Sequence, residues 1–139
     1  MTTKKHTATL LILMVLGLTG LVHAQRYTTI KAQVPFNFVA NGETMPAGEC
    51  TVRLIVNGQT TLSISSGKQH TFVFPIVDES PNGSNKTTLV FHRYGDRYFL
   101  ARIKRAGRIG YELPATKLES ELRAGNVAEE VFTLLASVE

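Results

Sequence analysis

The chain has 139 residues, of which 43% are hydrophobic and 19% are charged, with one cysteine and no tryptophan. This length fits one small domain, and the apolar content is too high for a disordered chain. The net charge of +4, from 15 Lys and Arg against 11 Asp and Glu, is too small to indicate nucleic-acid binding.

The first 24 residues predict a secretory signal peptide. Lys4 and Lys5 precede an apolar run over residues 10–22, and Ala24 supplies a small residue of the kind that a signal peptidase reads. The run is shorter than the roughly 20 residues that span a bilayer, and an uncut membrane anchor is the alternative. We expect cleavage after Ala24 and a single mature domain over residues 25–139, with a net charge of +2 and no transmembrane segment. The domain would then be periplasmic or extracellular.

The mature chain alternates apolar and polar residues in the pattern of half-buried strands. The first such stretch runs from Ile30 to Phe38, and Pro35 within it indicates a sheet edge or a bulge because proline has no N–H to donate. Pro75 gives the same indication later in the chain, and Asn57-Gly58 predicts a tight hairpin turn. Further strands are predicted over residues 50–56, 60–65, 69–77, 87–94 and 97–104, with a short one ending at residue 113.

Toward the C-terminus the pattern becomes helical. Thr116 and Glu119 fit a capping box, in which Thr116 accepts a backbone hydrogen bond and Glu119 reaches back toward it. Leu118 and Leu122 lie four residues apart on one helix face, and Gly125 is placed to end the helix.

Residues 131–136 fit either a helix or a last strand, and their Val, Phe and Thr content favours the strand. About seven or eight strands predict a mainly β fold, a small antiparallel β-sandwich or barrel with one short helix near the C-terminus.

The most distinctive segment is Leu89–Leu100, with the sequence LVFHRYGDRYFL. If its Gly-Asp pair forms a two-residue loop, Arg93 lies opposite Tyr98 and Tyr94 lies opposite Arg97, so each guanidinium can cover a tyrosine ring. One interpretation is a structural hairpin whose register these pairs fix. The other is a binding site for a glycan or an anionic group. Its candidate ligand-binding residues are His92, Arg93, Tyr94, Arg97 and Tyr98.

Charge is unevenly distributed along the mature chain. Residues 86–108 carry a local charge of +6, whereas the chain from Glu112 onward carries −4. Either the two segments pair with each other in the fold, or the basic one forms a surface for a polyanion.

Cys50 falls on the apolar face of a predicted strand. This position indicates a buried, unreactive thiol, and an intermolecular disulfide or a reactive thiol is the alternative. A lone cysteine cannot form a disulfide within its own chain, so the domain must be stable through core packing alone.

Sequence signatures of catalysis are weak. The chain has no HExxH, CxxC, GxSxG or glycine-rich phosphate loop. We therefore expect no catalytic residue, no metal site and no cofactor. An enzyme of unknown class is the alternative, for which His92 with Asp96 would be the candidate couple.

Four segments resemble a family of uncharacterised, signal-peptide-bearing exported proteins of acidobacteria. They are residues 34–38 (VPFNF), residues 46–49 (PAGE), the hairpin segment at residues 89–100, and Gly110 with Leu113-Pro114. The resemblance implies export and a bacterial origin, and it implies no activity. Cys50 stands where the family has an aromatic residue, usually Tyr, and Lys104 stands where Trp is common.

Together these observations favour an exported, non-enzymatic β-domain that acts by binding or assembly in the bacterial envelope or outside the cell. A polysaccharide or another envelope protein is the expected partner, and nucleic acid is not. A glycan- or polyanion-binding module that uses the hairpin is the alternative function. Self-association through an uncovered edge strand, at residues 34–39 or in the terminal strand, is a further expectation.

Overall fold

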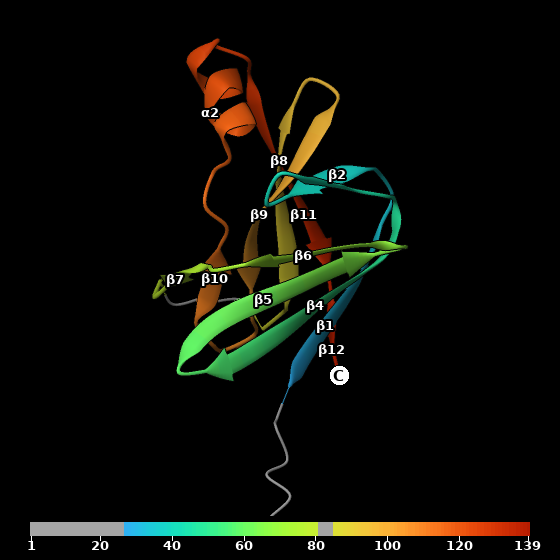
Figure 1. The fold of residues 1–139 in the computed structure, drawn as a ribbon, viewed down its shortest axis with the longest axis vertical. Coiled ribbons are helices and arrows are strands. Elements are labelled where there is room, and N and C mark those ends of the chain that lie inside the picture. The colour runs from blue at the N-terminus through green and yellow to red at the C-terminus, as the bar shows by residue number, and fades with distance from the viewer. Residues whose placement is uncertain (1–26, 81–84) are drawn as a thin grey trace, which may run out of the picture.

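The chain folds into two β-sheets with one short helix beside them (Figure 1). The computed structural model describes residues 27–80 and 85–139, and the predicted signal peptide lies outside them. Within these residues the helix is α2 (Lys117–Ala124). The strands are β1 (Thr28–Val34), β2 (Phe38–Ala40), β3 (Glu43–Met45), β4 (Gly48–Asn57), β5 (Gln59–Ser66), β6 (Gln69–Val73), β7 (Ile76–Asp78), β8 (Thr88–Tyr94), β9 (Arg97–Lys104), β10 (Gly110–Glu112), β11 (Glu129–Leu135) and β12 (Ser137–Val138).

The two sheets form the layers of a small sandwich. The five-stranded sheet has the order β12-β1-β4-β5-β6. The seven-stranded sheet follows β11-β8-β9-β10-β7, with β2 beside β9 and β3 beside β2. In Figure 1, β4 and β5 run across β8 and β9, as in crossed packing of two layers. The structure confirms the predicted mainly β class with one short helix near the C-terminus.

The strands are more numerous than predicted, because two prolines divide predicted segments and a tight turn forms an additional hairpin between them. Pro35 follows the end of β1, and the chain then crosses to the other sheet as β2. Pro75 separates β6 from β7 in the same way. Between β2 and β3, Asn41 and Gly42 have φ values of 50° and 82°, which a tight hairpin turn requires.

The two predicted open edges have different outcomes. Residues 34–39 do not form an uncovered edge, because β1 lies between β12 and β4, and β2 lies between β3 and β9. That prediction is wrong, since Pro35 moves the chain into the interior of a second sheet. The terminal segment is a strand, as predicted, and β11 forms one end of the seven-stranded sheet.

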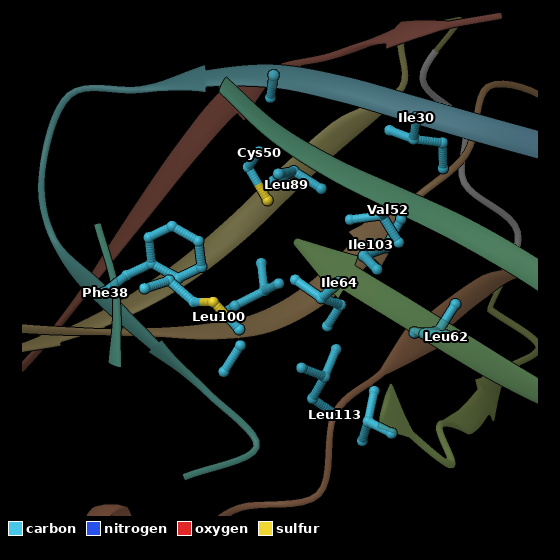
Figure 2. Packing of buried hydrophobic residues seen from close by; sticks show 14 of the residues in the cluster. Ile30, Phe38, Cys50, Val52, Leu62, Ile64, Leu89, Leu100, Ile103 and Leu113 are labelled. Carbon is cyan, nitrogen blue, oxygen red and sulfur yellow. The ribbon is translucent and has the colours of Figure 1, made fainter. Parts of the chain in front are cut away.

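The hydrophobic core lies between the sheets (Figure 2). Val52 and Ile64 from the five-stranded sheet and Phe38, Leu89 and Leu100 from the seven-stranded sheet are each at most 3% exposed. Because burial stabilises a protein by about 25 cal/mol per Å² of apolar surface, this cluster is the main source of stability.

Cys50 belongs to this core. It is 0% exposed, and its sulfur lies beside Leu89 in Figure 2. Burial raises the pKa of the thiol from 9.0 to about 12. While the domain is folded, the thiol has no access to a second chain, which fits the interpretation as an unreactive core residue.

Helix α2 begins and ends as predicted but faces the sheet differently. The Thr116 hydroxyl accepts a hydrogen bond from the backbone N–H of Glu119 at 3.4 Å, and Gly125 is the C-terminal cap. The predicted apolar face at Leu118 and Leu122 is not the buried one, since Leu118 is 37% exposed and Glu119 is the buried residue of the helix. The helix therefore turns a carboxylate toward the sheet.

Candidate binding groove at the hairpin tip

The β8–β9 hairpin has the register that the sequence predicted. Arg93 pairs with Tyr98, and Tyr94 pairs with Arg97, across a turn that begins at Gly95. Gly95 has φ 65°, in the left-handed region that glycine adopts at little cost. The five candidate ligand-binding residues therefore lie close together in the chain, but they divide between the two faces of the hairpin.

Arg93 and Tyr98 occupy the face that packs against the core. The guanidinium carbon of Arg93 is 5.4 Å from the centroid of the Tyr98 ring, as predicted, and Arg93 Nη1 is 3.4 Å from Glu130 Oε2. Phe36 also stacks on the Tyr98 ring, with centroids 3.7 Å apart. With Phe36 and Arg93 against it, the Tyr98 ring is not an open stacking surface.

Tyr94 occupies the opposite face and is 2% exposed. Its ring packs edge-on to Phe99 at 5.8 Å. Its hydroxyl accepts a hydrogen bond from Arg123 Nε at 2.7 Å and donates one to Glu129 Oε2 at 2.8 Å. Burial is the main cause that raises the pKa of Tyr94 to about 12. The predicted cover of this ring by Arg97 does not form, and Arg97 stays exposed.

Glu119 completes a polar cluster with His92, Tyr94, Arg123 and Glu129. Its Oε1 is 3.0 Å from His92 Nδ1, 3.1 Å from Arg123 Nη2 and 3.3 Å from the Tyr94 hydroxyl. On the other side of the imidazole, His92 Nε2 is 3.6 Å from Glu129 Oε1. The polar cluster joins β8, α2 and β11, and it holds the helix beside the hairpin tip (Figure 1).

A groove of about 540 Å³ lies where the hairpin tip, the start of α2 and the β2–β3 hairpin meet. The parallel pairing of β2 with β9, at Val39 and Phe99, brings the β2–β3 hairpin to this place. Polar residues of the groove come from all three elements: Asn37, Thr44, Asp96, Arg97, Tyr98, Thr116 and Lys117.

The groove carries more cationic than anionic groups. Arg97 makes no ion pair with any residue of the described ranges, and Lys117 has only a 3.8 Å contact with Glu121, with its side chain 92% exposed. The first turn of α2 adds the partial positive charge of a helix N-terminus. Asp96 is the one carboxylate among the described groove residues. An anionic group would therefore find two side-chain cations in the groove.

The basic and acidic segments pair only in part. Arg93 lies 3.4 Å from Glu130, and Arg102 Nε lies 3.5 Å from Glu112 Oε2. Arg97 forms no such pair in the part of the chain that the structure describes, so the hairpin tip keeps basic character.

The geometry does not assemble the predicted His92–Asp96 couple. The imidazole of His92 lies between Glu119 and Glu129, whereas Asp96 lines the groove. Over residues 27–80 and 85–139, no group of three His, Cys, Asp or Glu side chains is placed to hold a metal ion.

Sequence reasoning identified Arg97 and Tyr98 but missed the other contributors to the groove. The capping box located the start of α2, and with it Lys117, but no local pattern indicated that this turn would lie beside the hairpin tip. Asn37 and Thr44 were missed because their position depends on the pairing of β2 with β9.

Comparison with known proteins gives no family model, no curated protein and no solved structure that matches the chain. Among the described residues, no helix has the length and apolar character needed to cross a membrane.

Proposed function

We propose that the protein is an exported binding domain without catalytic activity, and that its groove holds an anionic group of a polysaccharide. The observation that carries the proposal is the Arg97 side chain, which lines the groove without an ion-pair partner in the described chain. A guanidinium binds carboxylate, sulfate or phosphate through two parallel hydrogen bonds, and Lys117 can supply a second positive charge.

The remaining polar groups of the groove suit the hydroxyls of a sugar. Thr44 and Tyr98 bring hydroxyls that can donate and accept hydrogen bonds. The Oδ1 of Asn37 accepts a hydrogen bond from the Ala47 N–H at 2.9 Å, which fixes the amide with its NH2 group still able to donate. We place recognition in these hydrogen bonds because neither tyrosine of the hairpin offers an open ring for stacking.

Export and the absence of catalysis are parts of the proposal with separate support. The sequence of residues 1–24 and the resemblance to exported acidobacterial proteins support a periplasmic or extracellular location. Against a role as general base, both ring nitrogens of His92 face carboxylates, at 3.0 and 3.6 Å.

Chromatography on immobilised heparin and on an acidic cell-wall polysaccharide tests the groove. We expect the purified protein to be retained at low salt and released as salt screens the contacts. Arg97→Ala with Lys117→Ala should weaken binding about tenfold, because each exposed charge contact is worth up to about 1 kcal/mol. The matched control is Arg53→Ala with Arg108→Ala, which removes two exposed charges elsewhere. Elution of both double variants at the same salt concentration would overturn the proposal.

A further inference from the structure

An exposed apolar ridge runs along β6 and β7. It consists of Phe72, Phe74 and Ile76, which are 56%, 62% and 57% exposed. The buried residues of β6 are instead Thr71 and Val73. The segment from β6 to β7 therefore places its larger apolar side chains in solvent, which is uncommon unless another surface covers them.

The ridge lies on the outermost strands of both sheets. β6 ends the five-stranded sheet and β7 ends the path of the seven-stranded sheet (Figure 1). The backbone edge of β6 is partly occupied, since the Phe72 carbonyl accepts a hydrogen bond from Asn41 Nδ2 at 2.9 Å. The side chains are therefore the more accessible contact surface.

One end of the ridge is held in place by its neighbours. His70 packs against the Phe72 ring with centroids 4.4 Å apart, and its Nε2 lies 2.9 Å from Ser63 Oγ. A side chain that is already ordered loses less entropy on binding, which favours association.

The charges that flank the ridge are opposite in sign. Lys68 precedes it and Asp78 follows it, five residues on either side of Val73, and the chain between them carries no Lys, Arg, Asp or Glu. Lys68 makes no ion pair within the described ranges. When two copies of such a segment meet antiparallel about a twofold axis, the Lys of each faces the Asp of the other, and Phe72 meets Phe74.

We propose that the ridge binds the same ridge of a second copy of this chain, related by a twofold axis. The ridge is self-complementary, since one patch supplies an apolar centre and both signs of charge at its ends. An aromatic side chain buries at most about 250 Å², so three side chains fall short of the roughly 800 Å² per partner of a standard interface. The dimer is therefore weak and depends on concentration.

Sedimentation velocity over a series of concentrations tests the ridge. The purified protein should sediment as a monomer when dilute and show a rising average sedimentation coefficient as it is concentrated. Phe72→Ser with Phe74→Ser should remain monomeric throughout, and circular dichroism should be unchanged because both side chains are exposed. A wild-type protein that stays monomeric at millimolar concentration would overturn the proposal.

A charge exchange tests whether the partner is a second copy. Lys68→Glu should weaken the dimer about fivefold, and adding Asp78→Lys should restore it, because the exchanged charges attract again across the axis. Asp78 Oδ1 accepts a hydrogen bond from the Ser80 N–H at 3.0 Å, so the fold of the double variant is checked by its thermal melt. Lys68→Glu alone leaves the hydrogen bond between Asp78 and Ser80 unchanged. If this variant dimerises as strongly as the wild-type protein, the proposed twofold pairing of Lys68 with Asp78 is wrong. The groove is a separate surface, so failure here leaves the polysaccharide proposal untouched.

Discussion

At the scale of single residues, the buried thiol of Cys50 links stability to alkaline pH. Its pKa is about 12 in the folded protein, against 9.0 as its ordinary value. Below pH 9 both states keep the proton, so the thiol has no effect on the pH dependence. Above pH 9 the unfolded chain loses the proton while the folded chain keeps it, so stability falls by about 1.4 kcal/mol per pH unit until about pH 12.

Urea unfolding between pH 8 and 11 measures this loss, and Cys50→Ala is the comparison. The variant should be somewhat less stable at pH 8, since the core loses a sulfur atom, and it should show a shallower decline above pH 9. The Tyr94 hydroxyl, whose pKa is also about 12, titrates in both proteins and cancels in the comparison. Parallel pH profiles would show that the thiol is not buried as described.

Gly95 gives a second prediction at this scale. Because its φ is 65°, Gly95→Ala should destabilise the protein by about 1–2 kcal/mol through the left-handed backbone alone, with no atom within 4 Å of the added Cβ. Gly125→Ala is the control, since Gly125 has φ −78° and its Cβ would meet ordinary contacts. Thermal or urea unfolding should separate the two variants, and equal losses would contradict the turn geometry.

At the scale of elements, helix α2 is attached to the sheet by the polar cluster instead of by an apolar face. Glu119 is 5% exposed, it accepts a hydrogen bond from Arg123 at 3.1 Å, and its Oε1 lies 3.0 Å from His92 Nδ1. Glu119→Ala would therefore leave these two groups without the carboxylate that faces them. We expect a loss of about 1–3 kcal/mol, toward the lower end because Arg123 is partly exposed and can turn to water.

Glu121→Ala is the matched control on the same helix. Its carboxylate lies 3.8 Å from Lys117 on the exposed side, where such a pair contributes less than about 0.5 kcal/mol. Urea unfolding measures the free energy of unfolding of each variant. A loss for Glu121→Ala as large as that for Glu119→Ala would contradict the described attachment of the helix.

The elements that could be predicted from the sequence are those with local causes. The turn at Gly95 set the register of β8 and β9, and Thr116 and Gly125 set the ends of α2, because each acts within a few residues. The role of Glu119 could not be predicted in this way. A glutamate three residues after an N-cap normally serves the cap, and only the approach of β8 brings His92 and Tyr94 beside its carboxylate.

At the scale of the whole molecule, the sequence indicated the β class, while the two prolines decided how the sheets connect. Pro35 and Pro75 were predicted to mark edges or bulges. The prediction is confirmed at Pro75, since β6 and β7 are both edge strands, and each proline also separates strands of different sheets. The groove follows from this crossing, since β2 reaches β9 only after the chain leaves the first sheet at Pro35. The part of the groove that the β2–β3 hairpin forms therefore depends on long-range strand pairing, which no local sequence pattern indicates.

The groove is proposed to recognise an anionic group carried by a saccharide. The most direct measurement is a titration of the 15N-labelled protein, followed by NMR, with a heparin tetrasaccharide and with a neutral dextran oligosaccharide of equal length. We predict saturable amide shifts at the groove, around Thr44, Arg97 and Lys117, with the acidic oligosaccharide only. Recognition in the groove is ruled out if the shifts do not saturate, if they centre on another surface, or if the neutral sugar gives an equal response.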